Sequence, residues 1–132
     1  TYNYLFLNRG SSTMNVLVIE SPYESTDEIE ALYSQFTDAE VDVDHASEID
    51  IEEVREDYDT VLSELVLENG VRGPDVLDQF EADRKALYTV WRSNEADDYP
   101  EIQEALDQYQ VIQKPRNHMD LEKVVREELD PQ

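Results

Sequence analysis

Short apolar blocks alternate with amphipathic stretches along most of this chain, from Met14 to its end. The continuous apolar block at 15–19 indicates a strand covered on both faces, whereas the alternating block at 41–46 indicates an edge strand. The spacing of apolar residues between Ile29 and Phe36 is helical. The whole pattern predicts strands over 15–19, 41–46, 60–65, 86–91 and 109–112. It predicts helices over 25–36, 49–55, 74–83, 99–108 and 119–129.

Regular alternation of strands and helices is typical of a parallel sheet with helices on both faces. We therefore predict one α/β domain with a doubly wound, five-stranded parallel sheet of the flavodoxin-like type. The 132 residues suffice for one domain with a real core. Residues 1–13 are poor in acids, unlike the rest, and are interpreted as an extension or an appended remnant; an extra strand over 2–7 is the alternative. The predicted domain is 14–132.

Charge narrows the possible partners. The chain has 33 acidic residues against 10 basic ones and a net charge of −23, which disfavours direct binding to nucleic acid or anionic membranes. The acids are spread along the chain rather than gathered in one patch, which favours a halophilic source, such as an archaeon, over a site for a basic partner. We therefore expect stability to fall in dilute buffer, because molar salt screens charges beyond about 3 Å.

Other chemistry is limited by what the sequence lacks. It has no cysteine, and therefore no disulfide or thiol chemistry, and no apolar run approaches the roughly 20 residues that span a membrane. We expect a cytoplasmic protein. The turn over 20–24 has no glycine to cradle a phosphate, which disfavours a small enzyme or nucleotide-binding flavodoxin-like domain, the weakest of three hypotheses.

Candidate chemistry gathers at predicted strand ends. Glu64 lies near the end of the third strand, and the carboxyl ends of parallel strands are where ligands usually bind. Glu20 and Ser21 follow the first strand, and Lys114 follows the fifth. Over 14–130 the chain resembles a response-regulator receiver domain. The features that carry the resemblance are Val18-Ile19-Glu20-Ser21-Pro22, Asp59 to Leu65 with Glu64 near its end, Gly73 with Val76 and Leu77, and Lys114-Pro115.

The resemblance implies a role for each pocket residue. Glu20 and Ser21 match the two acids that hold Mg²⁺ in the family, Glu64 matches the aspartate that accepts the phosphoryl group, and Lys114 matches the lysine that pairs with it. Ser21 is uncharged, so Glu20 and Glu64 are the remaining candidate ligands of a weakened Mg²⁺ site. The extra methylene of Glu64 shifts its carboxylate by more than about 1 Å, an error that can cost about 100-fold in rate.

Two further consequences follow from the resemblance. The family's switch hydroxyl, at the end of the fourth strand, falls near 91–93, and Ser93 is the candidate. The longer side chain of Glu64 can reach Lys114 and form a permanent ion pair that imitates the charge of the phosphorylated state. The alternatives are structural: Glu64 as a solvated carboxylate, and Lys114 as a residue that only ends its strand and neutralises nearby acids.

The leading hypothesis is a receiver-like module in signal transduction, not an enzyme, that acts through protein contacts with a degenerate phosphorylation pocket. Its partners would be a histidine kinase or an output or regulatory protein, with a possible homodimer through the fourth helix, fifth strand and fifth helix. The second hypothesis is a working but atypical receiver in a phosphorelay, phosphorylated by a histidine kinase at Glu64 or at Asp59.

Overall fold

The computed structural model describes residues 14–21, 30, 31, 33, 39–91, 98–114, 118–124, 126 and 127. Its five strands form one sheet in the order β2-β1-β3-β4-β5, and all four pairings are parallel. The strands are β1 (Asn15–Glu20), β2 (Glu40–His45), β3 (Thr60–Ser63), β4 (Arg84–Thr89) and β5 (Gln110–Gln113). This is the doubly wound order of flavodoxin-like domains, so the predicted fold class is confirmed.

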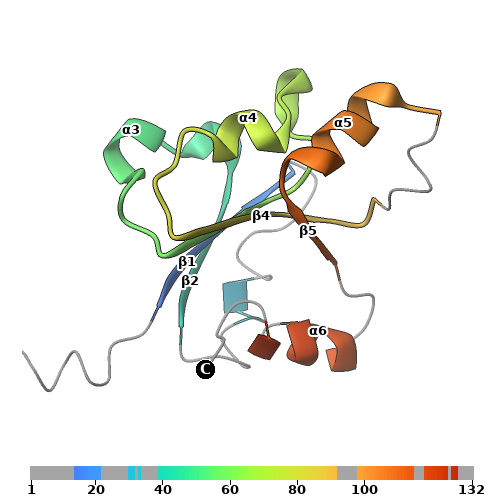
Figure 1. The fold of residues 1–132 in the computed structure, drawn as a ribbon. Helices are drawn as coiled ribbons and strands as arrows, with labels where there is room; N and C mark the ends of the chain where they lie inside the picture. The colour runs from blue at the N-terminus through green and yellow to red at the C-terminus, as the bar shows by residue number, and fades with distance from the viewer. Residues whose placement is uncertain are drawn as a thin grey trace, which may run out of the picture.

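Helices cover both faces of the sheet (Figure 1). One face carries α3 (Ile51–Val54), α4 (Gly73–Leu77) and α5 (Pro100–Gln108), and the other carries α6 (His118–Val124). Because side chains alternate along a strand, each face has its own buried cluster. Leu17 and Ile19 pack in the cluster under α4 and α5, whereas Val16 and Val18 pack in the cluster that includes Leu121 of α6.

The structure corrects several predicted boundaries. The fourth strand begins and ends two residues earlier than predicted, and the third ends at Ser63, so that Glu64 follows the strand. The helices predicted over 49–55 and 74–83 are shorter, and two short 3₁₀ turns, Ala46–Glu48 and Glu68–Gly70, were not predicted. Of the helix predicted over 119–129, residues 119–124, 126 and 127 are helical and the others lie outside the described residues. Of the helix predicted over 25–36, residues 30, 31 and 33 are helical and the others lie outside the described residues. Residues 1–13 also lie outside them, and the domain boundary at 14 stays a prediction.

Gly73 sets the close approach of α4 to the end of β3. A Cβ at this position would collide with the carbonyl oxygen of Glu64 and would lie 2.9 Å from Cδ2 of Leu87. The Gly73 N–H instead donates to the carbonyl of Leu65 at 2.8 Å. The absence of a side chain therefore lets α4 pack directly behind the residue that occupies the candidate acceptor position.

Candidate functional site

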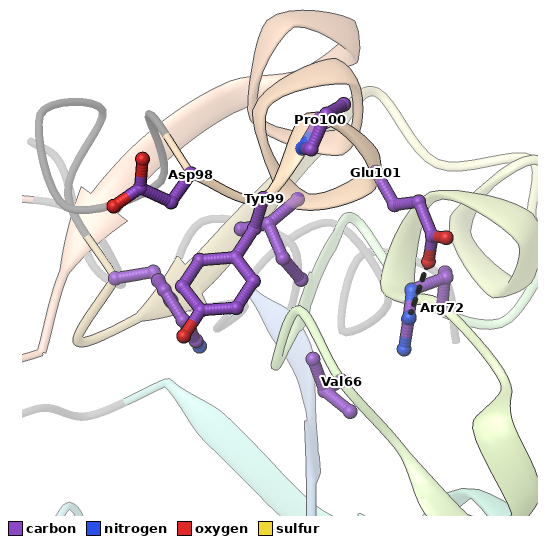
Figure 2. Close-up of a pocket in the computed structure, with 8 residues that line it drawn as sticks. Val66, Arg72, Asp98, Tyr99, Pro100 and Glu101 are labelled. Carbon is purple, nitrogen blue, oxygen red and sulfur yellow. Dashed lines mark hydrogen bonds and ion pairs between the residues drawn. The ribbon is translucent and has the colours of Figure 1, made fainter.

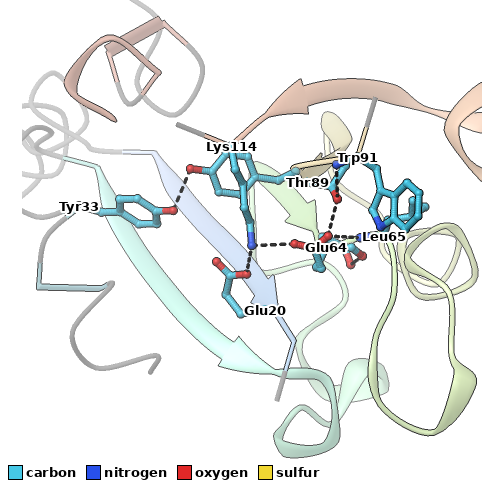
Figure 3. A network of polar contacts seen from close by, with 9 residues as sticks. Glu20, Tyr33, Glu64, Leu65, Thr89, Trp91 and Lys114 are labelled. Carbon is cyan, nitrogen blue, oxygen red and sulfur yellow. Dashed lines mark hydrogen bonds and ion pairs between the residues drawn. The ribbon is translucent and has the colours of Figure 1, made fainter. Parts of the chain in front are cut away.

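Polar side chains from four neighbouring strands meet at one edge of the sheet. Glu20 ends β1, Glu64 follows β3, Thr89 ends β4 and Lys114 follows β5. Parallel pairing brings these strand ends together, as Figure 3 shows for their side chains. Backbone hydrogen bonds extend the sheet to this edge, from Glu64 N–H to Ile19 at 2.9 Å and from Lys114 N–H to Thr89 at 3.0 Å.

Lys114 joins two carboxylates in this pocket. Its Nζ lies 2.5 Å from Oε1 of Glu20 and 2.7 Å from Oε2 of Glu64. The side chain of Glu20 is only 2% exposed, and those of Glu64 and Lys114 are 12% and 14% exposed. Burial alone would lower the pKa of Lys114, but the carboxylates of Glu20 and Glu64 raise that pKa above its ordinary value. The lysine is therefore charged, and the ion pair predicted between Glu64 and Lys114 is present.

The second carboxylate oxygen of Glu64 is also occupied. Its Oε1 accepts a hydrogen bond from the backbone N–H of Leu65 at 3.0 Å and another from the hydroxyl of Thr89. The Thr89 side chain is fully buried, and its Oγ1 accepts a hydrogen bond from the N–H of Trp91 at 3.3 Å. Glu64 is thus held by a cation on one oxygen and by two donors on the other, not solvated freely.

A second layer supports Lys114 from the α6 side of the sheet. Its Nζ lies 5.6 Å from the centre of the Tyr88 ring, within the range of a cation–π contact. The hydroxyl of Tyr33 donates to the hydroxyl of Tyr88 at 2.9 Å, and burial raises the pKa of Tyr88 to about 12. The pocket is therefore connected through Tyr88 to the helical segment that contains Tyr33 (Figure 3).

The described residues do not fit a tightly bound Mg²⁺ ion. Among them, no group of three or more histidine, cysteine, aspartate or glutamate side chains is arranged to hold a metal. Glu20 and Glu64 already share the ammonium group of Lys114, and Ser21 offers only a neutral hydroxyl. A divalent cation between these carboxylates would have to displace or repel the lysine, so we derive no chemical step from a metal here.

Thr89 is a pocket residue that the sequence analysis did not name. The switch hydroxyl was expected at 91–93, with Ser93 as the candidate; Ser93 lies outside the described residues, so that expectation stays a prediction. Strand register brings Thr89 to the pocket: Leu87 pairs with Ser63, so Thr89 lies at the end of β4 beside the acceptor position. The signal available in the sequence was a threonine inside the predicted strand over 86–91.

The placement of Asp59 corrects another expectation. Asp59 precedes β3, so it lies at the amino end of that strand, and its carboxylate accepts the N–H of Asn15 at 2.8 Å. The four residues of β3 separate it from Glu64, and the five residue steps between them span about 16 Å at about 3.3 Å per step. Asp59 therefore lies at the opposite edge of the sheet and not near the pocket, whereas its phosphorylation stays a prediction.

Comparison with solved structures supports the fold. The chain is similar to the receiver domain of the response regulator PhyR from Erythrobacter litoralis, solved by solution NMR, with a TM-score of 0.57 and 21% identity over 91% of this chain and 92% of that one. No protein-family model matches the chain, and no curated protein does. The chain therefore has the fold of a receiver domain, as its resemblance predicts.

Membrane insertion finds no support among the described residues. None of the helices there is both long enough and apolar enough to cross a bilayer.

Proposed function

We propose that this chain is a receiver-like interaction module of response-regulator signalling, in which internal ion pairs hold the phosphorylation pocket in one state. The observation that carries the proposal is the bridge from Lys114 to both Glu20 and Glu64, at 2.5 Å and 2.7 Å. The lysine that would meet an incoming phosphoryl group is already neutralised by the buried carboxylate of Glu20 and the partly buried carboxylate of Glu64. Lys114 therefore already faces the negative charge of Glu64, where in a phosphorylated receiver it would face the phosphoryl group.

The same contacts disfavour phosphoryl acceptance. A nucleophilic carboxylate needs a free oxygen directed at the donor, and both oxygens of Glu64 already have partners. Phosphoryl transfer also needs positive charge around the transferred group, which Mg²⁺ supplies in the family, and the donor set here does not favour that ion. We therefore propose a cytoplasmic, metal-independent, non-enzymatic role that depends on contacts with an output or regulatory protein.

The homodimer face remains part of this proposal. It comprises α5, β5 and α6. Exposed apolar side chains between Tyr99 and Tyr109 would support it. Tyr99 is 55% exposed, but Ile102 and Leu106 are buried in the core, and the outer side of α5 carries acids such as Glu104. Unscreened acids on both copies would repel each other, so we expect any dimer through this face to need high salt.

A working atypical receiver is the second candidate. The observation that favours it is that Glu64 contacts both a lysine and a hydroxyl, from Lys114 and Thr89, the two side chains that the resemblance expects around a phosphoryl acceptor. A histidine kinase could then use Glu64 if its carboxylate leaves the lysine. Because Asp59 lies at the opposite edge of the sheet, Glu64 is the acceptor that this hypothesis uses.

The two candidates are separated by intact-mass spectrometry after incubation with Mg²⁺ and phosphoramidate in molar KCl. We expect the native chain and Glu64→Gln to stay unmodified. If Glu64→Asp alone gains one phosphate, the shorter side chain has freed the acceptor from Lys114. A phosphate on the native chain that is absent from Glu64→Gln and still present in Asp59→Asn would overturn the interaction-module proposal and establish a working switch.

A further inference from the structure

Exposed apolar side chains are concentrated beside the pocket. Among the described residues, the large hydrophobic side chains that are exposed are Val71, Val90 and Tyr99, at 38%, 54% and 55%. All three lie on the two loops that follow β3 and β4, at the carboxyl edge of the sheet. On a surface as acidic as this one, apolar side chains gathered at one edge mark a contact site rather than random exposure.

The same loops enclose a groove. Two adjoining hollows, of about 450 Å³ and 590 Å³, share Val66 and Trp91 as lining residues. The first extends to Tyr99, whose ring meets that of Trp91 edge-on with centres 5.8 Å apart. The second extends to Val90 and reaches Glu64 itself. We call the two hollows together the Trp91 groove; Figure 2 shows its Tyr99 end, with Val66 below the ring.

The charges around the Trp91 groove are predominantly negative. Its lining includes the carboxylates of Glu64, Glu68, Asp98 and Glu101. Lys114 pairs with Glu64 and Arg72 pairs with Glu101, so the acidic character of the rim comes from Glu68 and Asp98. The cation among its lining residues is Arg72, whose guanidinium lies 3.3 Å from Glu101 and is thereby neutralised (Figure 2). A ligand of this groove therefore needs apolar groups for its floor and positive charge for its rim.

We propose that the Trp91 groove binds a segment of a partner protein in which one or two large apolar residues are flanked by lysine or arginine. Tryptophan, tyrosine and arginine are the residues that most often dominate binding energy at interfaces, and the groove presents Trp91, Tyr99 and Arg72. Positive flanks complement its acidic rim and favour encounter with this chain. The proposal rests on the interaction-module function and adds to it the contact surface and the chemistry of the partner.

The pocket network fixes one wall of the groove. The Trp91 N–H donates to Oγ1 of Thr89 at 3.3 Å, and its carbonyl accepts the side-chain amide of Gln113 at 2.8 Å. Thr89 in turn donates to Glu64, which pairs with Lys114. The backbone of Trp91 is therefore held in place by the same network that neutralises the phosphorylation pocket, which preorganises the groove for its partner.

Trp91 supplies a direct reading of occupancy, because it is the single tryptophan of the chain. We would titrate the chain with a set of peptides, each with one or two leucine or phenylalanine residues between lysines. Tryptophan fluorescence would be recorded at the lowest salt concentration that keeps the chain folded. Two matched control sets are used: one replaces the lysines by glutamate, and the other replaces the apolar residues by serine. We expect saturable binding and a blue shift of the tryptophan emission with peptides of the first set, and neither effect with either control set.

Variants locate the binding. Val90→Ser and Tyr99→Ala change exposed side chains and should weaken the peptide by about tenfold, whereas Gln110→Ala, exposed on β5 away from the groove, should not. The proposal fails if no lysine-flanked peptide binds, if glutamate-flanked peptides bind equally, or if the groove variants bind as the native chain does. Self-association in sedimentation that Tyr99→Ala abolishes would also overturn it, since the occupant would then be a second copy.

The two proposals fail separately. Transfer of phosphate to Glu64 with peptide binding intact overturns the locked pocket and leaves the groove. If no peptide binds and the chain also gains no phosphate, the groove proposal is overturned and the proposal of a locked pocket stands.

Discussion

Asp59 and Glu64 stand at the two ends of the same four-residue strand, yet their surroundings differ completely. Asp59 is partly exposed, and its carboxylate accepts the backbone N–H of Asn15 at 2.8 Å, a contact that secures the start of β1. Glu64 is 12% exposed and contacts a buried lysine, a buried threonine hydroxyl and a backbone N–H. The difference shows that strand polarity, not acidity, decides which carboxylate can take part in a site.

The largest expected effect comes from removing the cation on the Glu64 side. Lys114→Met leaves Glu20 and Glu64 as buried carboxylates without their shared partner, and losing one member of a buried pair typically costs about 3–5 kcal/mol. We expect that loss in the free energy of unfolding, measured by urea denaturation in molar KCl. A Glu20→Gln/Lys114→Met double variant should recover part of it. A loss under about 1 kcal/mol would show that solvent, not Lys114, satisfies the two acids.

Gly73→Ala tests the backbone on which Glu64 rests. The new methyl group would overlap the carbonyl oxygen of Glu64 and crowd Leu87, and overpacking of this kind costs about 1–3 kcal/mol. We expect that loss in thermal or urea unfolding, together with a changed chemical shift of the Glu64 amide by NMR. The matched change Gly70→Ala adds a methyl group in open space, although at a positive φ of 77°, and should leave the Glu64 amide unchanged.

Salt should change the free energy of unfolding through the exposed acids far more than through the ion pairs of Lys114 with Glu20 and Glu64. We propose that the net charge of −23 reflects adaptation to high salt, so the native chain should gain at least about 1 kcal/mol, or roughly 4 °C in thermal midpoint, between dilute buffer and molar KCl. The cost of Lys114→Met should change little with salt, since buried pairs are screened less. Equal midpoints of the native chain in both buffers would contradict the halophilic interpretation.

Alkaline pH should weaken the Glu64 end through Tyr88 and Lys114, and it should also act elsewhere, because burial raises the pKa of Tyr58 and of Tyr109 as well. Burial raises the pKa of Tyr88 to about 12, and the carboxylates raise that of Lys114 against the effect of burial. The folded-state pKa of Tyr88 lies above its unfolded value, so the stability that Tyr88 contributes is complete below about pH 10 and is lost as pH rises towards 12. The raised pKa of Lys114 acts in the same direction. We expect a loss of about 1 kcal/mol by pH 11 from Tyr88, measured by urea midpoints. Tyr88→Phe should have a shallower decline, and an unchanged slope would exclude Tyr88 as a cause.

The sheet could be predicted from the sequence because its strand blocks alternate with segments of helical spacing. The continuous apolar blocks need cover on both faces, and the alternating block at 41–46 fits an edge strand. The same pattern placed Glu20, Glu64 and Lys114 at one edge, because the ends of parallel strands necessarily meet there. These features depend only on burial and strand direction. The longer reach of glutamate also made its contact with Lys114 predictable. The ends of β3 and β5 lie on either side of β4, about 10 Å apart, and two long side chains can meet across that distance.

Register was the information that the sequence lacked. The strand β4 begins with the charged residues Arg84 and Lys85, and the apolar residues Val90 and Trp91 follow its end, so hydrophobicity alone moved the predicted strand by two positions. With that shift the search for a hydroxyl moved past Thr89 to 91–93. Asp59 was misjudged for a related reason: the aspartate is close to Glu64 along the chain, but the intervening strand carries it to the other edge.

The smallest expected effect comes from the Asp59 end. Asp59→Asn keeps an oxygen that can accept the Asn15 N–H and removes one charge from an acidic surface, so we expect a change of about 0.5 kcal/mol or less in the free energy of unfolding. Asp59→Ala removes the acceptor and should cost about 1 kcal/mol, because the N–H at the start of β1 then depends on water. Neither change should alter the groove fluorescence or any phosphate gained by Glu64→Asp. If Asp59→Asn instead cost as much as Lys114→Met, or abolished that phosphate, both ends of β3 would act in one site and strand polarity would not separate them.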